Sequence, residues 1–158
     1  MKTTPRNFIK TLSIIHFAMV LGPLLTGAIF YTNTELITNN GTQNDIFIYV
    51  FPLIALAGVF ASKFLFNLFI KNLKSHETLQ AKLAGYQTAS LIKFALIEGP
   101  AFLNIVWFSQ SGNLLYLTIG GVLILFLFMQ RPKAEKIETE LELNSEHKRQ
   151  FQKLDEPI

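Results

Sequence analysis

Long runs of hydrophobic residues take up most of the chain, and each run is long enough to cross a membrane as a helix. Four such runs cover about residues 11–31, 46–70, 83–108 and 113–130. The hydrocarbon core of a bilayer is about 30 Å thick and takes about 20 mostly apolar residues in a helix. The pattern therefore predicts an all-α integral membrane protein whose four transmembrane helices form a four-helix bundle.

After the fourth run the pattern changes. Charges of both signs alternate around Ile137 and Leu141, which are spaced i,i+4 as on one side of a helix. Residues 146–154 are compatible with a second short helical turn. We expect a transmembrane domain at residues 1–131 and a charged, partly helical cytoplasmic tail at residues 132–158. The tail is either a solvated extension or a docking helix for a cytosolic partner.

The first and third runs repeat each other at a separation of 77 residues. Aligning residues 11–23 (TLSIIHFAMVLGP) with residues 88–100 (TASLIKFALIEGP) gives seven identical positions out of 13, including Thr, Ser, Gly and Pro. We expect a helical hairpin used twice in the same orientation, with the two copies related by an axis along the membrane normal. The bundle would then have pseudo-twofold symmetry.

Each copy of the repeat ends on a Gly-Pro pair, Gly22-Pro23 and Gly99-Pro100. Proline lacks a backbone donor and kinks a helix, and glycine lets a neighbouring backbone approach closely. One interpretation is helix packing alone. The other is a bend that opens backbone carbonyls to a site at the middle of the membrane.

The placement of basic residues predicts the orientation of the spans. The connections at residues 32–45 and 109–113 contain no Lys or Arg. The other side carries Lys2, Arg6, Lys10, Lys71, Lys74, Lys82, Arg131, Lys133 and Lys136. Lys and Arg collect on the cytoplasmic side, so both termini should be cytoplasmic, in a bacterial cell (inner) membrane. Aromatic residues near the predicted outer helix ends, where their rings favour the interface, agree: Tyr31, Tyr49, Trp107 and Tyr116.

Composition agrees with this class of protein. Half of the 158 residues are hydrophobic and 16% are charged, against roughly 25% charged in soluble domains. The net charge of +3 is explained by the positive residues on the cytoplasmic face, so no nucleic-acid partner is expected. The expected partners are the lipid bilayer and further copies of the chain or a larger membrane complex.

Four ionisable residues lie within the predicted spans: His16, Lys63, Lys93 and Glu98. A charge at the bilayer centre costs at least about 2.5–3.5 kcal/mol. Lys63 lies near the cytoplasmic end, so its ammonium can reach the head groups. His16 and Lys93 occupy equivalent places in the repeat. A single membrane histidine is most often a hydrogen-bonded packing residue, and it does not indicate a metal site.

Glu98 is the main candidate for a functional site. Its side chain is too short to reach the interface, so the carboxyl must be protonated, paired or facing a wet cavity. Lys93 points about 140° away around the same helix and is not an i,i+4 partner. Lys93 shares a stripe with Asn104, and Glu98 shares another with Gln87. We expect His16 to be the partner of Glu98, and these five residues to form a polar network or an ion site.

The sequence lacks the motifs of most enzymes. It has no cysteine, no metal-ligand spacing, no nucleotide-binding glycine loop and no nucleophile motif. No cofactor or metal is therefore expected, and an enzyme is the class with the least support.

The duplicated hairpin with a carboxylate in one copy resembles the vacuolar-type ATPase proteolipid, the duplicated relative of the ring-forming c subunit. This resemblance implies that Glu98, in the run LIEGP, would take up and release a translocated proton. The segment ALIEGPAFLNIVWF, followed by Arg-Pro and a charged tail, is similar to small uncharacterised bacterial four-span proteins, which implies no function.

Two hypotheses follow. The first is a structural or assembly component that oligomerises or joins a larger membrane complex. The alternative is a proton- or cation-translocating subunit that uses Glu98.

Overall fold

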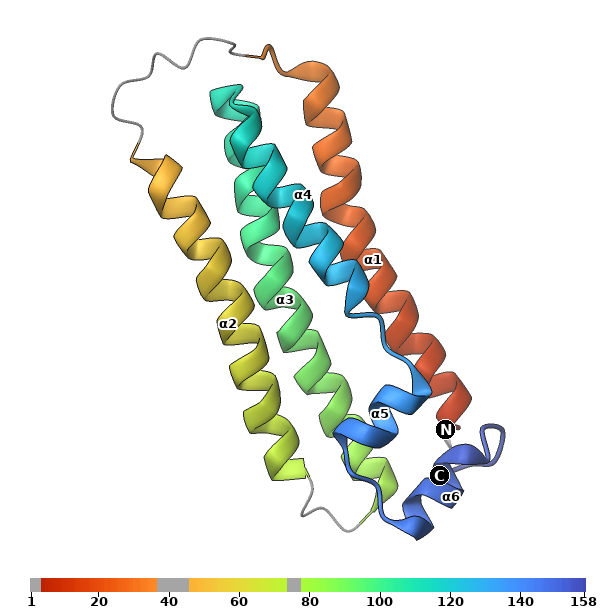
Figure 1. Cartoon of the computed structure of the whole chain (residues 1–158). Helices are drawn as coiled ribbons and strands as arrows, with labels where there is room; N and C mark the ends of the chain where they lie inside the picture. Colours follow the sequence, from red (N-terminus) through yellow and green to blue (C-terminus); the bar gives the residue numbers. More distant parts are fainter. Residues whose placement is uncertain (1–3, 37–45, 74–77) are drawn as a thin grey trace.

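The chain is all-α, as predicted, in a computed structural model that describes residues 4–36, 46–73 and 78–158 (Figure 1). Its helices are α1 (Pro5–Asn33), α2 (Phe47–Leu73), α3 (Leu79–Ser111), α4 (Leu114–Met129), α5 (Ala134–Glu140) and α6 (Ser145–Gln152). Lys2, Lys74 and most of the connection predicted at residues 32–45 lie outside the described residues.

Three helices, α1, α2 and α3, are long and apolar enough to cross a membrane. Helix α4 has 16 residues, which corresponds to about 24 Å. It meets that criterion only together with α5, from which it is bent by 85°. The chain therefore has three candidate spans, or four if the bent pair is one span, which indicates an integral membrane protein.

Local capping signals set several helix ends. The hydroxyl of Thr4 accepts a hydrogen bond from the backbone N–H of Asn7 at the start of α1, and Thr78 caps α3 in the same way. Helix α3 ends at Gly112, whose φ of 63° is left-handed and favours glycine. Asn113 follows at once and caps α4. The tight α3–α4 turn is thus encoded in two adjacent residues.

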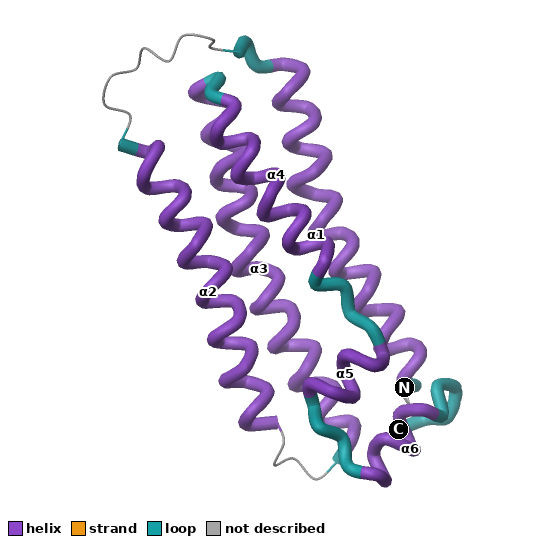
Figure 2. Tube along the Cα trace, in the orientation of Figure 1, coloured by secondary structure: helices purple, strands orange, loops and turns teal. Residues whose placement is uncertain are grey.

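Helix α3 is the centre of the bundle. It packs against α1, α2 and α4, whereas α1 and α2 lie on opposite sides of it (Figures 1 and 2). In the second hairpin α3 and α4 pack along each other, but in the first hairpin α1 and α2 are kept apart. The two hairpins therefore do not pack in the same way, and the internal repeat stays a prediction from the sequence.

Two glycines allow the close approach of helices to α3. A Cβ atom at Gly58 of α2 would lie 2.5 Å from the carbonyl oxygen of Leu96 and 2.8 Å from Cγ of Pro100. A Cβ atom at Gly120 of α4 would lie 2.9 Å from Cγ1 of Ile105. Only glycine fits at such distances, because real Cβ atoms do not come this close to other heavy atoms.

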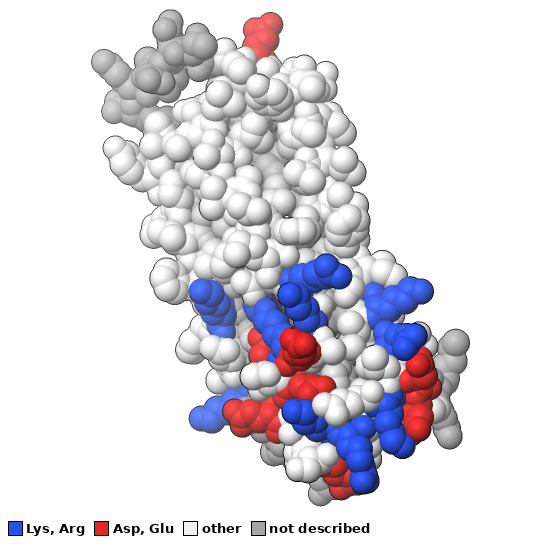
Figure 3. Space-filling model, turned by 45° about the vertical axis from the view of Figure 1, so that its right-hand side comes forward, with Lys and Arg blue, Asp and Glu red and all other residues white. Residues whose placement is uncertain are grey.

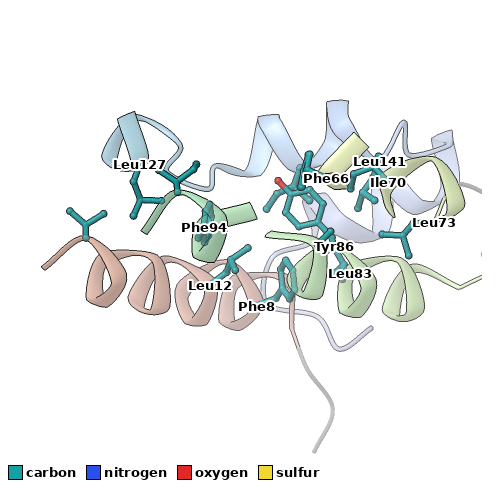
Figure 4. Close-up of a cluster of buried hydrophobic side chains, with 14 of the residues drawn as sticks. Phe8, Leu12, Phe66, Ile70, Leu73, Leu83, Tyr86, Phe94, Leu127 and Leu141 are labelled. Atoms are coloured by element: carbon teal, nitrogen blue, oxygen red, sulfur yellow. The ribbon is translucent and has the colours of Figure 1, made fainter. Parts of the chain in front are cut away.

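The tail is part of the core. Ile137 of α5, Leu141 directly after it and Phe151 of α6 are fully buried, and they join the side chains of the spans in one hydrophobic cluster. Figure 4 shows Leu141 beside Ile70 and Phe66. The apolar side predicted from the i,i+4 spacing thus packs against the chain's own helices and is not presented to a cytosolic partner.

Both ends of the described chain meet at the same end of the bundle (Figure 1). The backbone N–H of Arg6 donates to the carbonyl oxygen of Leu154 at 3.0 Å, and the Arg6 guanidinium pairs with Asp155 at 3.0 Å. Charged side chains gather at this end, next to a long uncharged band, on the face drawn in Figure 3. We call it the charged end of the bundle.

Aromatic residues cluster at the opposite end. Tyr116 is fully buried and packs edge-on to Phe51 at 5.4 Å between ring centroids, and Trp107 packs on Phe47 at 4.4 Å. The ring of Tyr116 therefore serves internal packing and does not face lipid. Tyr31 and Tyr49 are exposed, as residues at an interface would be.

Candidate functional site

Glu98 lies on the surface of the bundle between α3 and α1. Its side chain is half-buried, and its Oε1 atom lies 3.9 Å from the place where a Cβ atom of Gly22 would be. Gly22 leaves room for the carboxyl because it has no side chain. Among the described residues Glu98 makes no hydrogen bond or ion pair. The described part of the chain therefore does not satisfy this carboxyl group.

His16 is not the partner of Glu98, and that prediction is wrong. Its ring is buried, and its Nε2 atom lies 2.8 Å from the carbonyl oxygen of Leu127 on α4. Because a carbonyl only accepts, Nε2 carries the proton and donates it. The ring also packs edge-on to Phe94 at 4.8 Å. The Glu98 carboxyl instead lies beside Gly22, which is six residues, or about 9 Å, further along α1 than His16.

Lys93 is buried on another side of α3. Its Nζ atom lies 4.4 Å from the centre of the Phe66 ring of α2, a cation–π contact. The charges of Lys136 and Glu140, both on α5, act on the Lys93 ammonium in opposite directions, without a direct ion pair. Lys93 thus faces α2 and the tail while Glu98 faces α1, in line with their separation around the helix.

A group of polar residues that we call the tail cluster consists of Tyr86, Lys93, Lys136 and Glu140. The hydroxyl of Tyr86 donates to Oε2 of Glu140 at 2.6 Å, and Nζ of Lys136 lies 4.0 Å from Oε1 of the same carboxylate. The cluster ties α5 to α3. The pairing of Tyr86 with Glu140 was not predicted, because the two residues are 54 positions apart and no local pattern links them. The only local signal was the i,i+4 pair of Lys136 and Glu140.

Asn104 and Gln87 do not join Glu98 in one network. Asn104 is fully buried, and its Nδ2 donates to the carbonyl oxygen of Pro100 at 2.8 Å. Its Oδ1 has no partner within the described part of the chain. Gln87 is half-buried and has no hydrogen bond to any described residue. The five candidate residues are therefore distributed over separate places along α1 and α3.

The Gly-Pro pairs lie inside unbroken helices. Helix α1 continues past Pro23, and α3 continues past Pro100. Pro100 has no N–H, so the carbonyl of Leu96 loses its usual helical donor. Gly58 of α2 covers that carbonyl. The contact of Gly58 with Leu96 and Pro100 favours helix packing over an open mid-membrane site. Gly99 is different: a Cβ atom there would have no described atom within 4 Å, so this glycine does not serve packing among the described residues.

No metal centre is found in the described part of the chain, where no group of three or more His, Asp or Glu residues is placed to hold an ion. In comparisons with models of known families, with curated proteins and with solved structures, nothing matches the chain.

Proposed function

We propose that this chain is a structural or assembly component of its membrane, and that it associates with a second copy of itself through the face of α1 and α3 around Glu98. The observation that carries the proposal is the half-buried carboxyl of Glu98, which lies within a predicted span and has no partner among the described residues.

An unsatisfied carboxyl group is costly in hydrocarbon, even when it is protonated, because no water is present to bond with it. A protonated carboxyl both donates and accepts a hydrogen bond. Two copies of Glu98 that meet across a twofold axis would therefore satisfy each other. A twofold interface uses the same patch on both subunits, so this pairing needs no other protein.

Small residues beside Glu98 leave room for the second copy. Ala95 and Gly99 are exposed on α3 and are spaced i,i+4, the small-xxx-small pattern through which membrane helices approach closely. A Cβ atom at Gly99 would meet no atom of the chain within 4 Å. This part of α3 is thus free to contact another helix.

The test measures the monomer–dimer equilibrium in mild detergent by analytical ultracentrifugation. Interhelical hydrogen bonds in membranes contribute about 1–2 kcal/mol, so Glu98→Leu should weaken dimerisation about tenfold. Glu98→Gln keeps a donor and an acceptor and should stay within about threefold of the wild type. Leu53→Ala, at an exposed position of α2, is the control and should change nothing. Dimerisation of Glu98→Leu at wild-type strength would refute the proposal.

The second candidate is proton or cation translocation through Glu98, which the resemblance to the proteolipid implies. It is supported by the same carboxyl, because no described cation neutralises it within the chain. Glu98→Gln separates the two candidates, since it keeps hydrogen bonding but cannot release a proton. If Glu98 carries ions, Glu98→Gln should abolish flux in proteoliposomes. Unchanged flux in this variant would eliminate the ion-carrying role.

A further inference from the structure

A groove of about 530 Å³ lies near the charged end of the bundle, between α1 and the end of α4. From α1 it is lined by Lys10, Ser13, Ile14, His16 and Phe17. All of these except His16 share one helix face, because they are spaced three and four residues apart. From α4 and the turn after it come Phe128 and Arg131. Neither α5 nor α6 contributes a lining residue.

The basic residues of the lining lie at one level along the axis of the bundle, and the apolar ones lie at another. Lys10 and Arg131 stand at the edges of the first and fourth predicted spans, at the level of the lipid head groups. Ile14, Phe17 and Phe128 lie further into the spans, and each is more than half exposed at 59%, 53% and 51%. The groove therefore offers two cations at its mouth and a mainly apolar surface below them, and Ser13 and the buried His16, which is bonded to the Leu127 carbonyl, complete the lining.

The two cations are free to bind an anion. Neither Lys10 nor Arg131 forms an ion pair with any described acid. Four other basic residues at the same end are each paired with an acid: Arg6, Lys136, Lys148 and Lys153. Other basic residues that form no ion pair with a described acid, among them Lys71, Lys82, Lys133 and Arg149, do not line this groove, so Lys10 and Arg131 are the unpaired cations beside its apolar surface.

We propose that this groove binds one anionic phospholipid. Its phosphate would contact Lys10 and Arg131, and an acyl chain would lie on Ile14, Phe17 and Phe128. Basic pockets between transmembrane helices on the cytoplasmic side suit anionic head groups. A soluble anion would use only the mouth of the groove, whereas a lipid uses both parts. The nearly neutral tail has no part in this site.

The test titrates the purified protein in detergent with phosphatidylglycerol or phosphatidylcholine and measures bound lipid by native mass spectrometry. Phosphatidylglycerol should bind about 30-fold more tightly, since each of the two basic residues contributes about 1 kcal/mol, or about fivefold. The double variant Lys10→Gln/Arg131→Gln should bind both lipids equally. The control Lys63→Gln/Lys71→Gln removes the same charge from α2, outside the groove, and should keep the preference.

Soluble glycerophosphoglycerol distinguishes a lipid site from a simple anion site. It carries the phosphate without acyl chains and should not displace phosphatidylglycerol at the same concentration. Equal displacement would overturn the proposal in favour of a phosphate site. An equal loss of preference in the control variant would also overturn it, because binding would then depend on total charge and not on the groove.

Discussion

Gly58 lies where α2 packs tightly against α3. A Cβ atom at this position would lie 2.5 Å from the carbonyl oxygen of Leu96 and 2.8 Å from Cγ of Pro100. Pro100 leaves that carbonyl without its helical donor, and Cα–H groups of a closely packed glycine are weak donors to such oxygens. One proline and one glycine, 42 residues apart in the sequence, thus set this helix contact.

Gly58→Ala should destabilise the bundle by about 1–3 kcal/mol, as an inserted methyl does in a packed core. The methyl meets a backbone oxygen and a proline ring, neither of which can rotate away. Thermal unfolding in detergent, followed by circular dichroism, should show a melting temperature lower by several degrees. Gly121→Ala is the control, since a Cβ atom there meets nothing within 4 Å. Equal melting temperatures for the two variants would contradict this account.

The sequence pointed to the ionisable residues inside the spans but not to their partners. Lys93 and Glu98 were assigned to different faces of one helix from the rotation of 100° per residue, a local property. The partners depend on the register of neighbouring helices. Phe66 of α2 covers Lys93, and the Leu127 carbonyl of α4, not Glu98, binds His16. Register is decided by all the packing contacts together, so no single motif carries it.

At the scale of elements, the short helix α5 holds the tail against the bundle. Its buried residue Ile137 enters the core together with Leu141, which caps the end of the helix, and its Glu140 accepts a hydrogen bond from Tyr86 of α3. A helix of seven residues is not stable alone in water, so this packing must hold it in place. The charges that alternate around these residues keep its outer side soluble.

Ile137→Ala should release the tail. Replacing a buried isoleucine by alanine costs about 2–5 kcal/mol, so the open form should be populated about 30-fold more or higher. Trypsin cleavage near Lys133 and Lys136, measured on the protein in detergent, should accelerate by the same factor when opening is fast. Thr139→Ala changes an exposed residue of α5 and should leave the rate unchanged. A wild-type cleavage rate for Ile137→Ala would show that the tail is not held by the core.

At the scale of the whole molecule, the described charges lie mainly at one end, and the two termini lie there together (Figures 1 and 3). The contact between Arg6 and Asp155 joins the beginning of α1 to the end of the tail. Both termini therefore lie on the same side of the band that would occupy the bilayer, as an even number of crossings requires. The excess of Lys and Arg predicts that this side is cytoplasmic.

Cysteine labelling tests that orientation, because the wild-type chain has no cysteine to react. Glu35→Cys, next to the end of α1, should react with a membrane-impermeant maleimide on intact cells. Gln150→Cys, exposed on α6, should react only after the membrane is permeabilised. The unsubstituted chain is the blank. The reverse pattern of labelling would place both termini outside.

The sequence alone determined the class of this protein and the approximate position of each helix. Hydropathy over about 20 residues, capping residues such as Thr78 and Asn113, and the i,i+4 spacing of Ile137 and Leu141 are local signals, and they do not depend on distant contacts. Only the tertiary structure decided that α3 is central, that the tail folds back into the core, and that Glu98 has no partner among the described residues. These features depend on which helix faces lie against each other, and similar apolar faces carry little information about that choice.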